Sequence, residues 1–268
     1  MYSVVILTLN EEKALPECLA SLQGCDDVVI LDSGSTDGTA SIAAAAGARV
    51  FTHPFDSFAS QRNHAQKVIP FRHPWVFHLD ADERMTPELD AECRQASGRT
   101  GLDGFRVAPK MMFEGRWVRH CTDYPAYQAR FVRAPSFAFI QVGHGQREAV
   151  DMRMENLREG YLHDLFIYGT QAWLDKHRQY ARAEAKNLAS SGGQSPWKGI
   201  LSGDPLARRR ALKRLSFLLP FRPALRFAYQ YGLRLGFLDG RPGLHYCLLL
   251  ARYEGFITEE IKKLRRET

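Results

Sequence analysis

The first hundred residues alternate short apolar runs with longer segments in which apolar side chains recur at helical spacing. The runs predict strands at Ser3–Leu9, Val28–Leu31, Arg49–Thr52 and Trp75–Leu79, and the segments between them predict helices at Leu15–Leu22, Thr39–Ala46 and Phe58–Val68. Thr86 before Pro87 predicts a further helix, with threonine as its N-cap and proline in its first turn. Strands that alternate with helices are typical of an α/β fold with a mostly parallel sheet, because right-handed crossovers return each strand to its neighbour's side.

The pattern changes after about residue 100. Short β-like runs at Gly104–Ala108 and Gln128–Val132 are followed by a long predicted helix at Ala172–Ala189. Ser190–Gly203 is rich in serine and glycine, which predicts a loop or hinge. We therefore expect a sheet-containing domain at residues 1–168 and a helical C-terminal extension at residues 169–268.

Composition narrows the class of protein. With 268 residues, 45% of them hydrophobic, the chain can bury the core of one large domain or of a domain with an appendage. Its five cysteines form no Cys-x-x-Cys pair, which argues against a disulfide framework or a structural zinc site and favours a reducing compartment. No basic leader precedes the first apolar run, and no apolar stretch approaches the roughly 20 residues that a membrane-spanning helix needs. A cytoplasmic protein is expected.

The positive charge is concentrated in one segment. The chain has a net charge of +6, and Pro205–Leu238 contains no acidic residue. Its cations are Arg208, Arg209, Arg210, Lys213, Arg214, Arg222, Arg226 and Arg234, interleaved with Leu215, Phe217, Leu218, Leu219, Phe221, Phe227, Tyr229 and Tyr231. A basic helix with a large apolar face can lie at an anionic membrane surface, which makes peripheral membrane association our expectation. Packing of that face on the first domain is the alternative. No nucleic-acid-binding signature is present, so no nucleic acid partner is expected.

The fourth predicted strand breaks abruptly into an acidic cluster. Asp80 and Asp82 follow the run Trp75–Leu79, with Glu83 directly behind them. Ligands of open α/β sheets bind beyond the carboxyl ends of the strands, where these side chains would emerge. Clustered carboxylates repel one another unless a cation lies between them, and Mg²⁺ or Mn²⁺ bound by carboxylates and substrate phosphate oxygens is the usual solution. A solvated acidic turn is the alternative that this motif leaves open.

Two further motifs carry polar chemistry. Asp32 ends the second predicted strand, where its carboxylate can accept hydrogen bonds from a base or a ribose, although a plain strand–turn–helix connector would look the same. Arg62 lies in a predicted helix, and its planar guanidinium would suit a diphosphate unless it is simply a surface arginine. The turn Thr8–Glu12 after the first strand contains no glycine, which argues against dinucleotide binding.

Taken in order, these motifs resemble those of glycosyltransferase family 2. The matching segments are Val5–Glu11, Asp32–Asp37, Arg62-Asn63 and Leu79–Glu83. Downstream, the segments Tyr127–Phe131, Gly145–Glu148, Leu162-His163 and Gly236–Gly240 are similar to those of the bacterial lipopolysaccharide core glucosyltransferase branch. The resemblance covers nearly the whole chain. It implies a GT-A (Rossmann-like) fold: a mostly parallel sheet flanked by helices, here with a helical, basic C-terminal extension.

The resemblance also implies roles for individual residues. The nucleotide-sugar would be bound by Thr8, Asn10, Glu11, Asp32, Arg62 and Asp80, and the Mn²⁺ or Mg²⁺ ion by Asp82, Asp80 and His163. The family's inverting mechanism requires a general base near the acceptor hydroxyl. Glu148 is the predicted base and Asp123 the fallback. Relatives often have His-Glu at this place, whereas this chain has Arg147-Glu148, with His144 four residues before the glutamate.

The implied function is transfer of a hexose such as glucose from a UDP-sugar to a lipid-anchored saccharide, for example the lipopolysaccharide inner core. The enzyme would lie at the inner face of the cytoplasmic membrane. A glycosyltransferase that acts on a protein side chain is one alternative. A nucleotidyltransferase would be expected to carry a glycine- and lysine-rich loop where this chain has Asn10-Glu11-Glu12. A non-catalytic binding module would be expected to lack a metal carboxylate, yet Asp80 and Asp82 are both present.

Overall fold

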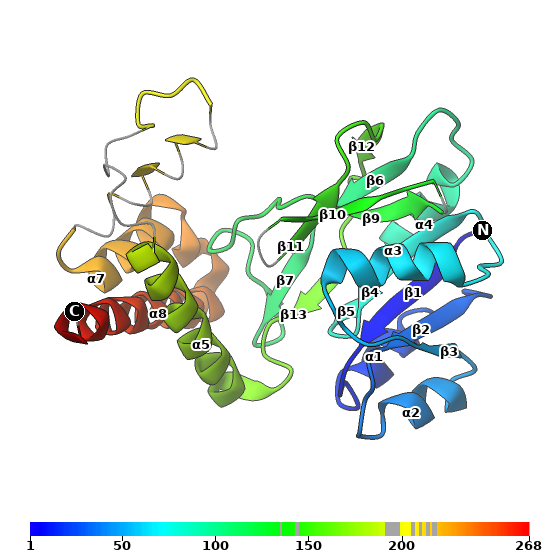
Figure 1. Cartoon of the computed structure of the whole chain (residues 1–268), viewed down its shortest axis with the longest axis horizontal. Coiled ribbons are helices and arrows are strands. Elements are labelled where there is room, and N and C mark those ends of the chain that lie inside the picture. Colours follow the sequence, from blue (N-terminus) through cyan, green and yellow to red (C-terminus); the bar gives the residue numbers. More distant parts are fainter. Residues whose placement is uncertain are drawn as a thin grey trace. The chain divides into compact units, whose positions relative to one another are not determined.

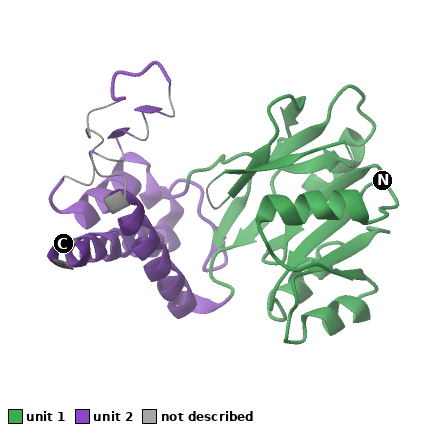
Figure 2. Cartoon of the chain, in the orientation of Figure 1, with its two compact units in different colours: residues 1–112, 123–167 green, residues 113–122, 168–268 purple. Residues whose placement is uncertain are grey.

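The chain folds into two compact units. The computed structural model describes residues 1–134, 136–142, 145–190, 199–204, 207–208, 211–212, 215 and 219–267. One unit comprises Met1–Met112 and Asp123–Ile167, and the other comprises Phe113–Thr122 and Tyr168–Thr268 (Figure 2). The first unit contains the large sheet and the second is mainly helical (Figure 1). The functional division at residue 168 stays a prediction.

A seven-stranded sheet forms the centre of the first unit, in the order β12-β6-β9-β4-β1-β2-β3. Its strands are β1 (Ser3–Thr8), β2 (Val28–Asp32), β3 (Arg49–Thr52), β4 (Trp75–Asp80), β6 (Gly104–Val107), β9 (Gln128–Arg133) and β12 (Met154–Asn156). β1 runs parallel to β2 and β4, and β2 runs parallel to β3, whereas β9 is antiparallel to both β4 and β6. The predicted α/β fold with a mostly parallel sheet is confirmed.

Helices cover both faces of this sheet, as Figure 1 shows. They are α1 (Leu15–Ala20), α2 (Thr39–Ala45), α3 (Phe58–Val68) and α4 (Pro87–Ala96). Residues of α1, α2 and α4 pack into one buried cluster, and α3 packs into another on the opposite face. The Thr86 hydroxyl accepts the backbone N–H of Leu89 at 3.2 Å, so the predicted N-cap of α4 is confirmed.

The alternation of side chains along β4 determines on which face of the sheet Asp80 lies. Trp75, Phe77 and Leu79 belong to the large core cluster, whereas Val76 packs into the cluster with α3. Because successive side chains of a strand point to opposite faces, Asp80 lies on the same face as Val76. The carboxylate that ends β4 therefore meets side chains from α3.

Two smaller sheets include the remaining strands of the first unit. The hairpin of β10 (Phe139–Val142) and β11 (Gly145–Glu148) carries the predicted base. In the other, β13 (Leu162–Asp164) pairs antiparallel with β5 (Glu83–Arg84) and parallel with β7 (Lys110–Phe113). The register of β13 and β5 sets His163 opposite Glu83, which brings the predicted histidine ligand to the acidic cluster.

The second unit confirms that the C-terminal part is helical. It contains α5 (Gly169–Ser190), α7 (Arg222–Phe227), the π-helix η1 (Ala228–Leu233), the 3₁₀ helix η2 (Gly236–Asp239), α8 (Gly240–Glu267) and the short strand β8 (Arg116–Trp117). In the described part of the chain, every helix is too short or too polar to cross a bilayer. Residues 191–198 of the predicted hinge and Arg209, Arg210, Lys213, Arg214, Phe217 and Leu218 of the basic segment lie outside the described residues.

The buried carboxylate of Asp239 binds the segment Phe113–Thr122 within the second unit. The Asp239 carboxylate accepts the backbone N–H groups of Arg119, His120 and Cys121 at 3.2, 2.9 and 2.8 Å. The ring Nδ1 of His120 lies 2.8 Å from the same carboxylate. Burial acts to raise the pKa of Asp239, but these hydrogen bonds outweigh it and lower the pKa. The Gly236–Gly240 motif thus has a structural role.

Candidate active site

The carboxyl ends of β1 and β2 meet in a buried hydrogen bond. Thr8 and Asp32 are paired in the register of the two strands, and the Thr8 hydroxyl donates to Asp32 at 2.7 Å. Asp32 also accepts the backbone N–H of Gly34 at 3.0 Å and both the N–H and the hydroxyl of Ser35, at 2.8 and 2.5 Å. Burial acts to raise the pKa of Asp32, but the hydrogen bonds, those from Ser35 above all, lower it. Asp32 is therefore a fixed negative charge that shapes the loop after β2.

The loop after β1 is tied to the loop after β2. The Asn10 backbone N–H donates to the Ser35 hydroxyl at 2.8 Å, and the Asn10 side-chain oxygen accepts the Thr36 N–H at 2.9 Å. The Glu11 N–H donates to the Thr39 hydroxyl at 2.8 Å. Asn10 has a φ of 57°, in the left-handed region that asparagine tolerates better than most residues. The predicted nucleotide-binding residues of these two loops therefore lie together on one rim of the sheet.

Two buried arginines hold Asp80. Arg62 on α3 donates to one carboxylate oxygen at 2.7 Å, and Arg130 on β9 donates to the other at 3.0 Å. The arginines are only 1% and 4% exposed. Burial acts to raise the pKa of Asp80, but the two guanidinium groups hold it well below the usual range. Asp80 is therefore ionised, and both its oxygens are already engaged.

The Arg62 guanidinium has unused hydrogen-bonding capacity. Its Nε and Nη1 atoms are buried and have no hydrogen-bond partner among the described residues. Leaving a buried donor unpaired costs about 1–3 kcal/mol, unless a ligand or a water molecule accepts the bond. Arg62 is thus prepared to bind an acceptor group that the folded chain does not itself supply.

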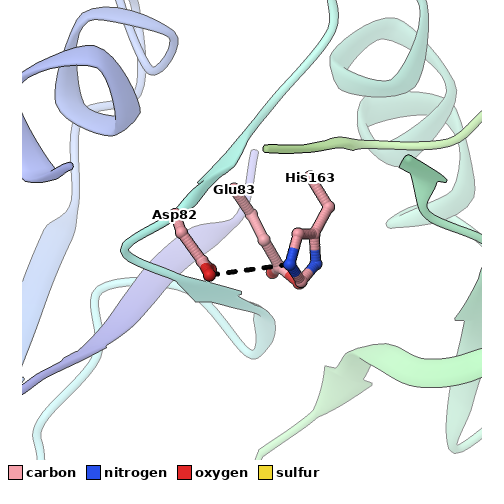
Figure 3. A group of neighbouring side chains, drawn as sticks. All are labelled: Asp82, Glu83 and His163. Atoms are coloured by element: carbon pink, nitrogen blue, oxygen red, sulfur yellow. Dashed lines mark ion pairs between the residues drawn. The ribbon is translucent and has the colours of Figure 1, made fainter. Parts of the chain in front are cut away.

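Asp82, Glu83 and His163 form a separate cluster (Figure 3). The His163 Nε2 atom lies 3.5 Å from an Asp82 oxygen, and its Nδ1 atom lies 3.4 Å from a Glu83 oxygen. One potential ligand atom from each of the three residues lies within 4.8 Å of the others. The structure therefore brings two of the three predicted metal ligands together, while Asp80 is held by Arg62 and Arg130 instead.

The charges of this cluster fit a bound cation. Burial raises the pKa of Asp82 to about 6, although His163 opposes the shift. For His163, burial acts to lower the pKa, but the neighbouring Glu83 and Asp82 raise it to about 9. Near neutral pH the two carboxylates therefore retain a proton on the imidazole, and a divalent ion can replace that positive charge. Carboxylate oxygens with an imidazole nitrogen are a donor set that suits Mn²⁺.

Glu83 has a supporting place in this arrangement. It is fully buried, and its oxygens accept hydrogen bonds from Arg130 at 2.8 Å and from the Asp80 backbone N–H at 2.8 Å. Its position next to His163 Nδ1 favours the tautomer that leaves Nε2 available beside Asp82. Asp82 and His163 are therefore candidate metal ligands, and Glu83 lies where it can orient the histidine.

A cavity of about 570 Å³ connects Asp80 with the predicted base Glu148. Among the described residues it is lined by Phe58, Arg62, Asp80, Arg106, Tyr127, Gln128, Ala129, Arg130, Gly145, Gln146, Arg147 and Glu148. Its volume lies in the range of small-molecule sites. Asp123, the fallback base, is exposed and is not part of this lining. His144 lies outside the described residues.

Glu148 is held at one oxygen only. The Arg106 side chain donates from Nε to the Glu148 Oε1 atom at 2.6 Å, and no hydrogen bond to Oε2 is found in the described part of the chain. The hairpin that carries Glu148 is fixed to α3, because the Asn63 amide donates to the Phe139 carbonyl at 2.8 Å and accepts its N–H at 2.9 Å. The Arg62-Asn63 motif thus binds Asp80 with its first residue and positions this hairpin with its second.

Comparison with known proteins gives a match over more than half of the chain. The profile of glycosyl transferase family 2 matches residues 3–151. The lipopolysaccharide core biosynthesis glycosyltransferase LpsC of Rhizobium meliloti (strain 1021) is 37% identical over 134 residues, which cover 44% of this chain and 49% of LpsC. The glycosyltransferase Mb0553 of Mycobacterium bovis is 30% identical over 213 residues, which cover 76% of this chain and 93% of Mb0553. The match therefore spans only about half the length of LpsC.

Solved structures with a similar backbone include TarS and a glucosyl-3-phosphoglycerate synthase. TarS 1-349 of S. aureus, also solved with UDP-GlcNAc, has a TM-score of 0.46 at 17% identity and covers 100% of this chain and 92% of that one. Glucosyl-3-phosphoglycerate synthase of Mycobacterium tuberculosis, in complex with Mn²⁺, UDP and glucosyl-3-phosphoglycerate, has a TM-score of 0.34 at 24% identity and covers 42% of this chain and 44% of that one. Similarities of this size transfer no ligand or substrate to this chain.

Proposed function

This chain belongs to glycosyl transferase family 2, and we propose that it is a metal-dependent, inverting enzyme that uses a UDP-sugar. The observation that carries the proposal is the pair of Asp82, which follows β4, and His163 on β13, together with a cavity lined by Asp80 and Glu148. The first unit contains candidate residues both for binding the UDP-sugar and for deprotonating the acceptor hydroxyl. Family membership leaves a nucleotidyltransferase without support.

On the donor side, Thr8 and Asp32 would contact the nucleoside at the rim of the sheet. Arg62 would use its free Nε and Nη1 groups on the uracil or the diphosphate. Asp82 and His163 would hold Mn²⁺ or Mg²⁺, which when bound neutralises the negative charge that develops on the departing UDP. Asp80 pairs with Arg62 and Arg130, so it would orient these two arginines rather than bind the metal.

On the acceptor side, Glu148 is the proposed general base. An acceptor hydroxyl attacks the anomeric carbon from the face opposite the UDP, and a new carbon–oxygen bond forms as the bond to the phosphate oxygen breaks. The bonding electrons leave with UDP, and the hydroxyl proton moves to Glu148. Arg106 occupies Oε1 of this carboxylate, so Oε2 remains available for the proton.

We propose a hexose such as glucose as the transferred sugar and a lipid-linked saccharide, such as the lipopolysaccharide inner core, as the acceptor. The support is the similarity to LpsC, whose name assigns it to lipopolysaccharide core biosynthesis. The test is a UDP-release assay with a panel of UDP-hexoses and GDP-mannose, combined with core saccharides or protein acceptors, with and without Mn²⁺. We expect Mn²⁺-dependent UDP release that requires both a UDP-hexose and a core saccharide. Release that requires a protein acceptor instead would favour the alternative, and turnover of GDP-mannose alone would contradict the donor assignment.

We further propose that the second unit binds the inner face of the cytoplasmic membrane. Large apolar side chains between residues 219 and 238 are unusually exposed; Phe221 is 81% exposed and Leu233 80%, and the others are Leu219, Leu225, Tyr229, Leu235, Phe237 and Leu238. The sequence from 205 to 238 supplies positive charge and no negative charge. One of these cations, Arg222, pairs with Glu254 of α8. Exposed apolar side chains together with the remaining positive charge are the combination that anionic lipid surfaces bind.

Replacing Phe221 and Leu233 together with serine is expected to weaken binding to phosphatidylglycerol vesicles by about 100-fold, because each side chain loses roughly 1.5 kcal/mol or more of apolar burial. Co-sedimentation with the vesicles measures the effect. Val150→Ser, at a 91% exposed apolar position of the first unit, is the matched control and should sediment like the wild type. Equal sedimentation of the double variant and the wild type would refute the proposal that this surface binds membranes.

A further inference from the structure

The cavity between Asp80 and Glu148 has more positive than negative charge. Among the described residues that line it there are four arginines and two carboxylates. Arg62 and Arg130 share Asp80, and behind the wall Arg130 also contacts the buried Glu83. The two other arginines, Arg106 and Arg147, line the cavity together with Glu148, and these three residues are called the Glu148 wall.

Arg147 provides the uncompensated charge of this wall. It is exposed on β11, next to Glu148, and no ion pair of its guanidinium is found in the described part of the chain. Arg106 is paired, but with the proposed base itself, at Oε1 of Glu148. A second anion bound here would therefore be held by Arg147 and could share Arg106 with Glu148.

The rest of the lining fits a saccharide. Phe58 and Tyr127 are 44% and 40% exposed, so their rings can cover the apolar face of a sugar. The side-chain oxygen of Gln146 is buried without a hydrogen-bond partner, and it can accept a bond from a sugar hydroxyl. Arg62, whose unpaired N–H groups the proposed function assigns to the donor, lines the same cavity.

The donor's diphosphate does not account for the charge of the Glu148 wall. Neither Asp82 nor His163, the proposed metal ligands, lines the cavity, and neither do Thr8 and Asp32 at the nucleoside rim. Donor phosphates follow the metal, whereas Arg106 pairs with the residue that would deprotonate the acceptor, and Arg147, its neighbour in sequence, lines the same cavity. The donor residues that do line the cavity, Arg62 and Asp80, pair with each other, so the excess charge lies at Arg106 and Arg147 on the acceptor side.

We propose that this cavity is an acceptor subsite for a saccharide that carries an anionic group, a phosphate or a carboxylate, bound by Arg147 and Arg106. The inference rests on the proposed function and names the substrate class of the same site. Guanidinium groups bind such anions through paired, charge-assisted hydrogen bonds, which give both affinity and a fixed orientation. The anionic group would set the acceptor hydroxyl next to Glu148, and an uncharged saccharide would bind poorly.

The test compares glucose 6-phosphate with glucose as probes, in the full chain with saturating UDP and Mn²⁺, by ligand-observed NMR or calorimetry. We expect glucose 6-phosphate to bind at least about ten-fold more tightly, since one charge-assisted contact contributes enough for such a factor. Arg147→Gln and Arg106→Gln should each remove most of this preference. Arg153→Gln is the matched control, because Arg153 is an exposed arginine of the same unit that pairs with Asp103, and it should leave the preference unchanged.

The outcomes separate this inference from the proposed function. If UDP binds in an Mn²⁺-dependent way but glucose 6-phosphate binds no better than glucose, the anionic subsite is refuted and the proposed function stands. If glucose 6-phosphate binds tightly to the chain without UDP and saturating UDP abolishes this binding, the anion site belongs to the donor diphosphate, which also overturns the inference. If UDP does not bind at all, the proposed function fails and the inference fails with it.

Discussion

Replacing Glu148 with glutamine is expected to slow sugar transfer by about 10²- to 10⁴-fold and to leave UDP binding unchanged. Glutamine has the size of glutamate, and its side-chain oxygen can still accept the hydrogen bond from Arg106 that holds Glu148 at 2.6 Å. It cannot take up the proton of the acceptor hydroxyl. The loss should therefore occur in kcat, and the dissociation constant of UDP should stay at the wild-type value.

The matched control for this variant is Asp123→Asn. Asp123 is the other carboxylate that the sequence offers as a base, but it is exposed and does not line the cavity with Asp80 and Glu148. Steady-state kinetics with Asp123→Asn should resemble those of the wild type. Near wild-type turnover of Glu148→Gln, together with a large loss in Asp123→Asn, would move the base to Asp123.

Replacing Asp80 with alanine is expected to lower the free energy of unfolding by about 3–5 kcal/mol. Asp80 is the ion-pair partner of Arg62 and one of two carboxylate partners of Arg130, and both guanidinium groups are almost completely buried. Without the carboxylate, the charge of Arg62 would remain in the interior with no compensating partner among the described residues. Urea unfolding followed by circular dichroism measures the change.

Two further variants make the Asp80 result interpretable. Asp151→Ala removes an exposed carboxylate of the same unit and should change the unfolding free energy by less than about 0.5 kcal/mol. The double variant Asp80→Ala with Arg62→Leu should recover part of the lost stability, because it removes the uncompensated charge as well. A cost below about 1 kcal/mol for Asp80→Ala would show that the buried arginines do not depend on it.

Local sequence signals predicted most elements of the first unit. The observed β3 and α3 have the predicted bounds, Arg49–Thr52 and Phe58–Val68, because apolar spacing and the Ser57 cap act within a few residues. The end of β4 was predicted for the same reason, since its apolar run stops at the acidic cluster. Where the signal is local, apolar periodicity and capping residues are sufficient to predict the bounds of a helix or strand.

The pairings within the site could not be predicted in the same way. Arg130 lies 50 residues after Asp80, and it reaches that carboxylate only because β9 is placed next to β4 in the sheet. The one signal that could have found it is an arginine between the apolar residues Ala129 and Phe131 of a predicted strand, a position that requires a buried partner. Arg106, 42 residues before Glu148, lies between Phe105 and Val107 and carries the same signal, but its partner could not be identified from the sequence.

The roles of the acidic residues and the contacts of Asp239 also depend on residues that are distant in the sequence. The acidic run alone does not distinguish Asp80, which binds two arginines, from Asp82, which lies beside His163. Likewise, nothing near Asp239 in the sequence indicates that it binds backbone N–H groups about 120 residues earlier. These contacts depend on how the helices and strands pack, and local sequence patterns do not predict that packing.

The most direct measurement is a calorimetric titration of UDP into the full chain with and without Mn²⁺, repeated with the Asp82→Ala variant. If Asp82 and His163 hold the metal of a UDP-sugar site, UDP binds the wild type only when Mn²⁺ is present, and Asp82→Ala loses this binding while remaining folded. Binding of UDP that is equally strong without Mn²⁺, or that persists with Mn²⁺ in Asp82→Ala, would contradict the assignment of the metal site. Absence of UDP binding under every metal condition would contradict the proposed donor.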